Sequence, residues 1–459
     1  MRGIKRTIAG TDGTNGTDGT TGTDGTDGTD GTTGTEKSRM SRMSRMSRVP
    51  EGWKMVKLGE VCARVCSGGT PKSTCSEYYD EGIIPWLNTK EVHSNRIYDT
   101  EKKITLKGLE NSSAKWIAAN SIVVAMYGAT AGNVAQTKIP LTTNQACCNL
   151  EMNSSIACSD FIFYSLRSCY SELLLLANGA AQQNLNAQVI KDFPIPLPPL
   201  PTQRKIAAVL GAIDNKIENN RKICANLEAQ AQALFKSWFV DFEPFGGKMP
   251  EGWKEVALSE IADFYGGYSY KGAELQDSDC AMATIKNFER GSGFKLNGFK
   301  EIVPSNKLRS SHEVDLFDSL VAHTDLTQKA EVIGNAEMLL SKAGYDKIIM
   351  SMDLVKVLPK RGVSKFLLGA LLKNPVFKAH CLRYVNGTTV LHLSKSALNT
   401  YTLFFPDDIS VLNRFAEVNE SICRELAMLI EQSRALSSLR DALLPRLMSG
   451  EIDVSEVAV

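Results

Sequence analysis

The sequence lacks the features by which secreted, membrane-bound or disulfide-stapled proteins are recognised. No apolar run approaches the roughly 18 residues that a membrane helix needs, and the N-terminus has no apolar segment of a signal peptide. The 11 cysteines are scattered and form no C-x-x-C pair, a pattern typical of buried thiols rather than of disulfides or a zinc site. We therefore expect a cytoplasmic protein that does not contact a membrane.

Motifs for catalysis are missing as well. The sequence has no H-E-x-x-H, Walker A or G-x-S-x-G motif, and no Asn-Pro-Pro-aromatic or Asp-Pro-Pro-aromatic motif such as amino-methyltransferases use on a flipped base. A nuclease needs acidic residues clustered around a metal, whereas the Asp and Glu here are scattered at ordinary frequency. We expect no active site and no metal site in this chain. The five histidines lie too far apart in sequence for metal ligands: His93, His312, His323, His380 and His392.

The sequence also lacks an excess of charge of one sign. The chain of 459 residues has a formal net charge of +1. Residues 1–48 hold eight Lys or Arg against six Asp or Glu, so the remainder is close to neutral. DNA binding would therefore require basic residues that are clustered in space. With 43% apolar residues, the chain is long enough for two or three domains with their own cores.

Residues 1–48 are of low complexity. Thr-Asp-Gly triplets dominate residues 11–35, and Ser-Arg-Met triplets follow at residues 38–47. Such a segment cannot bury apolar surface, so we expect it to be disordered. The three-residue period suggests expansion of short coding repeats, and Met40, Met43 or Met46 are alternative starts. We favour a solvated tail without function over a tail whose arginines touch DNA.

Two stretches have a regular apolar spacing. Between residues 206 and 238 the apolar side chains recur at alternating intervals of four and three, interrupted at Asn220, and the same spacing recurs 205 residues later, with Glu425 at the same step. This is the heptad pattern of a coiled coil, in which each helix would be about 50 Å long. We predict that the two helices pair within the chain, in preference to two unrelated amphipathic helices. The expected seam residues are Ile206, Leu210, Ile213, Ile217, Leu227, Leu234, Trp238, Phe415, Val418, Ile422, Leu429, Leu436, Leu439 and Leu443.

The chain also contains a duplicated segment. Residues 50–60 and 250–260 are identical at eight of eleven positions, beginning with Pro-Glu-Gly-Trp-Lys. A period near 200 is too long for a solenoid repeat and fits one domain followed by one long helix. We expect Trp53 and Trp253 to anchor the two cores. The second copy keeps the frame but replaces the glycine-rich segment at residues 127–132, as two modules that bind different targets would do.

Local patterns predict several elements of the first copy. Strands are expected at residues 83–88 and 121–126, and a helix at residues 160–178. The glycine-rich segment at residues 127–132 lacks the P-loop and dinucleotide-binding signatures, so we interpret it as a tight turn. The prolines at residues 193–201 exclude a helix or a central strand and indicate an extended spacer before the long helix.

Several motifs together resemble the specificity subunit of type I restriction-modification systems, over residues 49–459. These are Tyr-Gly-Ala-Thr-Ala-Gly at residues 127–132, Thr-Asn-Gln-Ala at 143–146, Pro-Leu-Pro-Pro-Leu at 196–200 with Gln-Arg-Lys-Ile-Ala at 203–207, Ala-Leu-Phe-Lys-Ser-Trp-Phe-Val-Asp-Phe at 233–242, and Leu-Arg-Asp-Ala-Leu-Leu-Pro-Arg-Leu at 439–447. Members of the family usually carry Glu where this chain has Thr202, and the second copy lacks the Pro-Pro-Leu run. These departures weaken a capping role at Thr202.

The resemblance implies an α+β fold, in which two mixed α/β target recognition domains in tandem pseudo-repeat are separated and joined by two long helices that form an antiparallel coiled coil. Each domain would read one half of an interrupted double-stranded DNA target, while the helices set the gap. The expected divisions are a disordered tail at residues 1–48, the first recognition domain at 49–200, a central helical spacer at 201–245, the second recognition domain at 246–408 and a C-terminal helical spacer at 409–459.

The resemblance also implies partners and cofactors. The helices would dock two modification subunits that carry S-adenosylmethionine, and restriction subunits with ATP and Mg would complete the complex, so that this chain binds no cofactor. A spacer of about 50 Å can hold two modules in major grooves one turn, about 34 Å, or more apart. The alternative is a structural adapter whose coiled coil joins two protein-binding modules without DNA readout. A gel shift with a salt titration distinguishes the two, because only DNA binding depends steeply on salt.

Candidate DNA-reading residues are polar side chains on predicted loops, because such groups contact base edges. Each is weighed against an ordinary role as a polar loop residue or turn former, and Asn144 and Gln145 could serve to tie a loop to the backbone. In the first module the candidates are Lys72, Thr89, Lys90, Tyr127, Asn144, Gln145, Gln182 and Gln183. In the second module they are Lys271, Lys286, Arg290, Lys295, His323, Thr324, Gln328 and Lys329.

Overall fold

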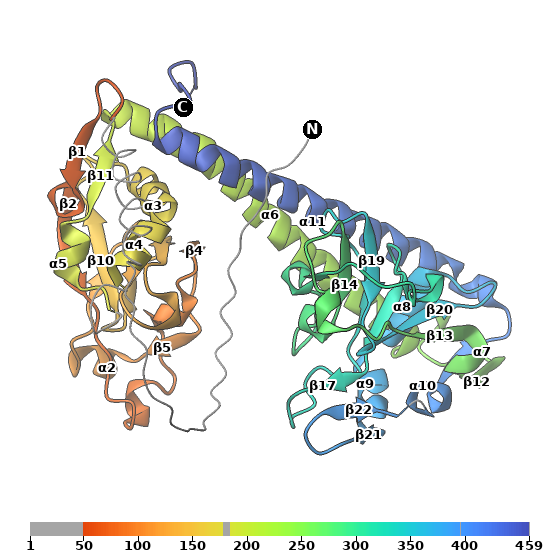
Figure 1. The fold of residues 1–459 in the computed structure, drawn as a ribbon. Coiled ribbons are helices and arrows are strands. Elements are labelled where there is room, and N and C mark those ends of the chain that lie inside the picture. Colours follow the sequence, from red (N-terminus) through yellow and green to blue (C-terminus); the bar gives the residue numbers. More distant parts are fainter. Residues whose placement is uncertain (1–48, 178–183, 395, 459) are drawn as a thin grey trace, which may run out of the picture. The chain divides into compact units, whose positions relative to one another are not determined.

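The fold of the chain is known from a computed structural model that describes residues 49–177, 184–394 and 396–458 (Figure 1). It is a mixed α+β fold with two long helices, α6 (Leu200–Phe239) and α11 (Asn413–Met448). None of the helices in these ranges has the length and apolar character required to cross a membrane. The prediction of a disordered tail concerns residues 1–48, which lie outside the described ranges.

The first module, between residue 52 and α6, contains two main sheets, and in one of them β3 and β9 run parallel. The larger sheet has the order β2 (Cys62–Ser67), β10 (Cys147–Met152), β7 (Ile122–Ala125), β8 (Val134–Thr137) and β4 (Asn95–Ile97). The second sheet has the order β5 (Lys102–Ile104), β3 (Ile84–Leu87), β9 (Leu141–Thr143) and β6 (Trp116–Ile117). Strands β3 and β7 confirm the two strands expected in this module.

The second module, between α6 and α11, repeats this strand order. Its larger sheet has the order β13 (Ala262–Gly266), β20 (Leu354–Pro359), β16 (Ser319–Ala322) and β18 (Ala336–Met338). The next has the order β15 (Lys300–Glu301), β14 (Cys280–Ala283) and β19 (Lys347–Met350), again with a parallel pair, β14 and β19. A third sheet consists of β17 (Thr324–Asp325), β22 (Leu391–Leu393) and β21 (Val385–Asn386). The modules differ at the position of β4, for which the described second module has no paired strand.

A two-stranded sheet precedes each long helix. In the first module β1 (Lys54–Lys57) pairs with β11 (Pro194–Leu197), and in the second β12 (Trp253–Ala257) pairs with β23 (Thr402–Pro406). The proline-rich segment is thus extended, as predicted, and forms part of a sheet edge, where the missing N–H groups of proline are tolerated. Helix α6 begins directly after it, with Pro201 in its first turn.

The helix expected at residues 160–178 is two helices. Helix α3 (Ser159–Ser168) ends at Cys169 and α4 (Tyr170–Ala177) follows. At the break the Ser168 hydroxyl donates to the Ser165 carbonyl at 2.7 Å, and such side-chain bonds compete with the helical ladder. The remaining α-helices of the described residues are α2 (Leu106–Glu110), α5 (Ala187–Lys191), α7 (Leu258–Ile261), α8 (Lys365–Leu372), α9 (Pro375–Leu382) and α10 (Ser396–Thr400).

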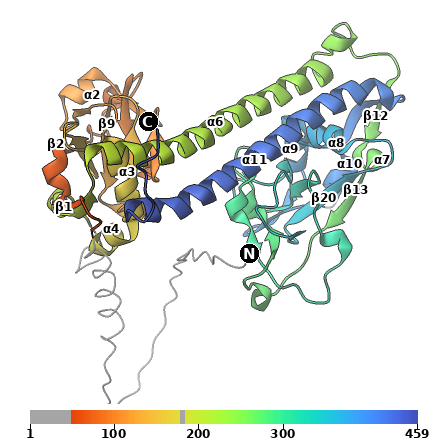
Figure 2. The ribbon, with the colours of Figure 1, turned by 90° about the horizontal axis from the view of Figure 1, so that it is seen from above.

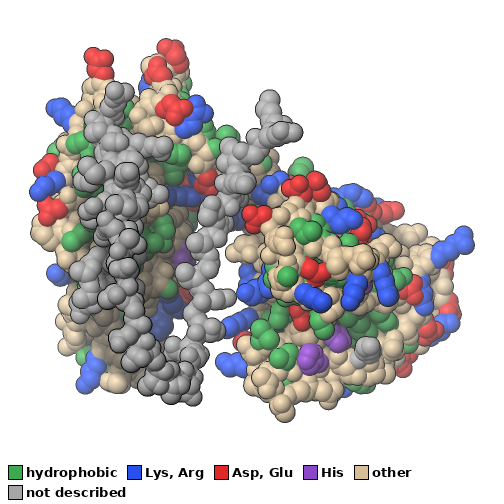
Figure 3. Space-filling model, viewed as in Figure 1, with side chains coloured by type: hydrophobic (Ala, Val, Ile, Leu, Met, Phe, Trp, Pro, Cys, Tyr) green, Lys and Arg blue, Asp and Glu red, His purple; other side chains and the backbone are tan. Residues whose placement is uncertain are grey.

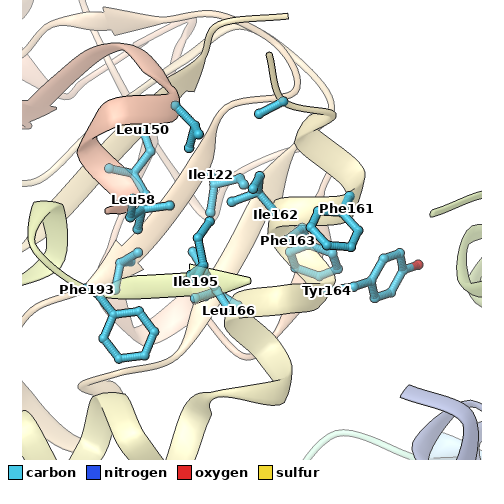
Figure 4. Packing of buried hydrophobic residues seen from close by; sticks show 14 of the residues in the cluster. Leu58, Ile122, Leu150, Phe161, Ile162, Phe163, Tyr164, Leu166, Phe193 and Ile195 are labelled. Atoms are coloured by element: carbon cyan, nitrogen blue, oxygen red, sulfur yellow. The ribbon is translucent and has the colours of Figure 1, made fainter. Parts of the chain in front are cut away.

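Each module has its own apolar core. In the first, Phe161, Ile162 and Leu166 of α3 pack on the larger sheet, whereas the hydroxyl of Tyr164 points out of the cluster (Figure 4). Trp53 packs against this core, with its ring 6.4 Å from that of Phe161. Trp253 packs likewise against the second core and lies 6.0 Å from the ring of Phe239 at the end of α6. Both tryptophans therefore occupy the core positions that were expected.

Helices α6 and α11 lie along each other (Figures 1 and 2). Trp238 near the end of α6 contacts Phe415 near the start of α11, with ring centroids 5.8 Å apart. Further back on α6, Asn220 Nδ2 donates to Gln432 Oε1 at 2.8 Å. Because the α6 residue number falls as the α11 number rises, the two helices run in opposite directions.

The buried stripe of α6 follows the expected seam, with Ile206, Leu210 and Ile217 inaccessible and Ile213, Leu227, Leu234 and Trp238 partly buried. On α11 the stripe alternates between expected and neighbouring positions. Phe415, Ile422 and Leu429 are buried and Val418, Leu436 and Leu443 are partly buried, but Asn419 and Leu426 are also buried, and Leu439 is 48% exposed.

The departure of α11 from the expected seam comes from the offset in residue number between matching positions of the two helices. Buried positions 206, 210, 217 and 220 of α6 match 415, 419, 426 and 429 of α11 at an offset of 209, instead of the 205 used for the sequence prediction. The two offsets differ by four residues, about one helical turn, so one column of the seam coincides and the other moves by one residue. Arg440 replaces Leu439 on the inner face, and the expectation for Leu439 was wrong.

Candidate nucleic-acid interface

Four loops of the first module are held together by hydrogen bonds. The N–H of Gly69 donates to the Thr143 carbonyl at 2.8 Å, and Trp86 Nε1 donates to the Gly69 carbonyl at 2.9 Å. Asn144 Nδ2 donates to Asn88 Oδ1 at 3.2 Å, which ties the loop after β9 to the loop after β3. The Thr130 hydroxyl donates to the Thr89 carbonyl at 2.9 Å and adds the turn after β7. We call these segments, residues 68–72, 88–91, 127–130 and 143–146, the first loop cluster.

Close backbone approach explains a glycine in each module. A Cβ atom on Gly68 would lie 2.2 Å from the Thr143 carbonyl oxygen, and a Cβ atom on Gly267 would lie 2.0 Å from that of Ser351. No side chain fits at either place. The turn at residues 127–132 is tight, as predicted: Gly128 has a φ of +80°, and the Ala131 N–H donates to its carbonyl at 3.1 Å.

The described candidates of the first module all belong to this cluster, but they are not equally available. Lys72, Tyr127 and Gln145 are exposed, and Gln145 contacts the Thr70 hydroxyl. Lys90 is exposed in an ion pair with Glu101, and this hydrogen bond raises the pKa of Lys90. Gln182 and Gln183 lie outside the described residues.

Two of the candidates have clear structural roles. Asn144 is buried, and its Oδ1 accepts from the Ala146 N–H at 3.2 Å, while its Nδ2 reaches Asn88. Thr89 is partly buried and lends its carbonyl to Thr130. Asn144 therefore ties a loop to the backbone, the alternative considered for it from the sequence.

Two loops of the second module form a corresponding cluster. Asn335 Nδ2 donates to the Glu289 carbonyl at 2.8 Å, and Asn287 Nδ2 donates to the Lys295 carbonyl at 2.7 Å. We call residues 285–295 and 325–335 the second loop cluster. Figure 3 shows Lys and Arg side chains exposed on the face of this module that the view presents.

Most candidates of the second module are exposed on these loops. Lys286, Arg290, Lys295 and Lys329 are exposed, and Gln328 is exposed with its amide donating to the Thr388 carbonyl. His323 is partly buried, and its N–H donates to the Asp353 carbonyl at 2.8 Å. Thr324 is buried, and its hydroxyl donates to Asp353 Oδ1 at 3.1 Å. Its observed role is therefore structural. Lys271 lies on a separate turn, where its N–H donates to Glu274 Oε2 at 2.7 Å.

Sequence reasoning missed a polar network between the first module and the long helices. Asp214 of α6 accepts from Tyr164 of α3 at 2.8 Å and from Arg440 of α11 at 2.8 Å. Arg96 Nη1 donates to Asn215 Oδ1 at 2.5 Å. Asp214 follows the seam residue Ile213 directly, so a charged residue beside a seam was the available signal.

No group of three or more His, Cys, Asp or Glu within the described ranges is arranged to hold a metal ion. The chemistry that the clusters offer is that of hydrogen-bond donors and positive charge on loops held by a rigid scaffold. Such groups suit contacts to phosphates and base edges.

Comparisons with known proteins point to one family. Residues 50–229 match the family described as the type I restriction modification DNA specificity domain. The type I restriction enzyme MjaIX specificity subunit of Methanocaldococcus jannaschii is 27% identical over 432 residues, which cover 89% of this chain and 95% of that protein. The type I restriction enzyme HindI specificity subunit of Haemophilus influenzae is 23% identical over 478 residues, covering 87% of this chain and 99% of the relative.

A solved structure shares the fold. The S subunit of a type I restriction-modification system from M. genitalium aligns with a TM-score of 0.57 at 16% identity, covering 86% of this chain and 96% of the other. Residues 50–229 therefore match a type I restriction-modification DNA specificity domain, and the chain as a whole is similar to specificity subunits of such systems, which agrees with the resemblance inferred from its motifs. The comparisons give no support to the adapter alternative.

Proposed function

We propose that the chain selects the DNA target of a type I restriction-modification complex by reading two separate half-sites, one with each module. The observation that carries this proposal is the shared strand order, β2-β10-β7-β8 in one module and β13-β20-β16-β18 in the other. Two copies of one scaffold with divergent loops suit a target made of two different halves. The first and second loop clusters would supply the contacts to base edges.

The long helices would act as an antiparallel coiled-coil spacer that sets the gap between the half-sites. The core of the first module includes Ile206 of α6 and Leu447 of α11. The core of the second includes Phe415 of α11, with Trp238 of α6 packed against it. Since each module is fixed to both helices, the length of the helical pair would determine the separation of the modules.

The same helices would dock two modification subunits, and restriction subunits would join the full complex. Met428 and Leu439 of α11 are 55% and 48% exposed, so both side chains are available for contact with a partner. S-adenosylmethionine would then be bound by the modification subunits, and ATP and Mg by the restriction subunits. This chain would bind no cofactor, and the complex would act in the cytoplasm, where its DNA target lies.

Two assays test the proposal. The chain is purified with its modification subunit, and binding to DNA duplexes is followed over a series of salt concentrations. We expect affinity to fall steeply with salt, because phosphate contacts release counterions. The isolated chain, incubated with labelled S-adenosylmethionine and DNA, should transfer no methyl groups. Salt-independent binding, or methyl transfer by the isolated chain, would contradict the proposal.

A further inference from the structure

A short hairpin in the second module carries an exposed arginine, Arg290, between Glu289 and Gly291. Phe288 and Phe294 form an isolated β-bridge, and their rings lie 5.7 Å apart. The Glu289 N–H donates to the Gly293 carbonyl at 2.9 Å, and Gly293 has a φ of +127°, a conformation that residues with a Cβ atom rarely adopt. The turn between these contacts, residues 290–292, is exposed.

A buried carboxylate holds this hairpin at its base. Glu337 of β18 accepts from the Gly293 N–H at 2.6 Å and from the Ser292 hydroxyl at 3.0 Å. Its other oxygen accepts from Lys373 Nζ at 2.7 Å, and the Glu337 side chain is only 5% exposed. Two of these three bonds reach the hairpin, so the carboxylate fixes the position of the turn.

The first module differs from the second at the position that corresponds to Glu337. In the second module Glu337 lies opposite Leu320 of β16, and in the first Ala135 lies opposite Val123 of β7. Ala135 is also paired with Asn95 of β4, so the segment beside β8 is held by backbone pairing. The described second module has no strand paired at that position of β18, and the Glu337 side chain accepts from the Gly293 N–H of the hairpin instead.

The arginine on this hairpin is held only weakly. Arg290 Nε lies 3.4 Å from Glu331 Oε2, and its side chain is 75% exposed. An exposed ion pair of this kind holds its side chains only weakly, because water and salt screen the two charges. Arg290 can therefore leave Glu331 for a DNA group, and a guanidinium offers two parallel donors to the acceptor atoms of guanine.

We propose that the hairpin at residues 288–294 reads bases of one half-site, that Arg290 determines specificity there, and that Glu337 is its positioning residue. This inference rests on the proposed function and extends it to named residues. Weak attachment of the arginine and firm attachment of its backbone are the combination that base reading needs, because the donor must be free while its location is fixed.

The test is methylation mapping in cells that express the full chain with its modification subunit. The variants are Arg290→Ala, Glu337→Gln and the matched control Asp318→Asn. Asp318 is 3% exposed and bonds Lys365 Nζ at 2.5 Å, so the control also removes the charge of a buried lysine-paired carboxylate in the same module. No described hydrogen bond joins the Asp318 side chain to residues 288–294. In Glu337→Gln only one end of the amide can accept, so its NH2 group faces either Lys373 or the Gly293 and Ser292 donors of the hairpin, and the attachment is lost on one side.

We expect Arg290→Ala and Glu337→Gln to relax the same one or two base pairs of a single half-site, with discrimination falling about tenfold or more, since a mismatch typically costs about 1–3 kcal/mol. The other half-site and the gap should stay unchanged, and Asp318→Asn should leave both half-sites unchanged. If Glu337→Gln acts like Asp318→Asn, or if the two variants affect different base pairs, the assignment is overturned. If the unaltered chain directs methylation to a target without two halves, the proposed function itself fails.

Discussion

Asp214 of α6 and Arg440 of α11 form an ion pair of 2.8 Å, in which the two side chains are 10% and 13% exposed. The second carboxylate oxygen accepts from Tyr164 of the first module at 2.8 Å. One carboxylate thus joins both long helices and the first module. Arg440 also bonds Asp441 at 2.8 Å, and Asp214 lies 3.6 Å from Arg167, so each charge keeps a second partner when the first is removed. Losing the buried bond should still cost more than losing an exposed pair.

We predict that Asp214→Asn and Arg440→Met each lower the free energy of unfolding by about 2 kcal/mol, the size of a buried hydrogen bond to a charged group. A double-mutant cycle on the whole chain, measured by denaturant unfolding, should give a coupling energy of about 1–3 kcal/mol. The control is the exposed pair of Glu420 and Arg424 on α11, whose side chains are 38% and 60% exposed. There we expect about 0.5 kcal/mol or less. Equal coupling in the two cycles would refute the structural role of Asp214.

A second prediction concerns Asn220, which is fully buried between the helices. Its Nδ2 donates to Gln432 at 2.8 Å and to Ser433 at 3.2 Å, while its Oδ1 accepts no hydrogen bond from the described residues. A buried asparagine in a helical seam costs stability. Asn220→Leu should therefore raise the free energy of unfolding by about 1 kcal/mol, which for a chain of this length raises the melting temperature by about 1 °C.

The control for Asn220→Leu is Asn226→Leu on the exposed face of α6, which should change stability by about 0.5 kcal/mol or less. The methylated target should stay the same, because Asp214–Arg440 and Trp238–Phe415 still fix the pairing of the helices. A lower melting temperature for Asn220→Leu would show that the polar contact outweighs apolar packing at this step.

Lys72 of the first loop cluster provides a third prediction. It is exposed, and the loop that carries it is anchored through Gly69 to Thr143. If Lys72 contacts a phosphate, Lys72→Ala should weaken binding to all sequences alike and reduce the slope of affinity against salt by about 1. The control is Lys54→Ala, an exposed lysine on β1 outside the cluster. Identical salt slopes for the two variants would show that Lys72 does not contact DNA.

The low-complexity segment gives a fourth prediction, drawn from sequence alone. Deleting residues 1–46 should leave the methylated DNA sequence unchanged, because the triplet repeats contain nothing that could form a reading surface. Methylation mapping of the truncated chain checks this. A changed target sequence would mean that the arginines of the Ser-Arg-Met repeats take part in recognition.

Sequence patterns predicted the periodic parts of this fold well. Strands β3 and β7, the extended proline-rich segment and both long helices follow from local spacing of apolar residues and prolines. The phase of the α11 seam did not follow, because an offset of 205 and one of 209 both give alternating steps of four and three. Only contacts with the modules, such as Asn419 Nδ2 to the Phe366 carbonyl at 2.8 Å, distinguish them.

The candidate site was predictable in outline, as polar residues on loops that meet in space. It was not predictable in detail, because the same residue types also hold loops together. Asn144 and Gln145 are adjacent, yet Asn144 is buried in a hydrogen-bonded tie and Gln145 is exposed. The role of Glu337 was hidden for another reason: its partners Ser292 and Lys373 are far from it in sequence.

The central claim is that the paired helices set the gap between two half-sites. Its test is the insertion of one heptad into each helix, after Leu227 in α6 and after Glu425 in α11. The contacts Asn220–Gln432 and Trp238–Phe415 place these two points opposite each other. Seven residues restore the seam and add about 10 Å. The insertion breaks the hydrogen bond from Ser341 to Glu431, because Glu431 moves away from the second module.

Methylation mapping of this variant is the most direct measurement. We predict that both half-sites keep their sequences while the gap grows by about three base pairs, since 10 Å corresponds to that length of duplex. Methylation should be weaker, because three base pairs also rotate the groove by about 100° and the DNA must twist to compensate. Unchanged half-sites separated by an unchanged gap would contradict the account, and would mean that the modules are positioned by something other than the length of the helices.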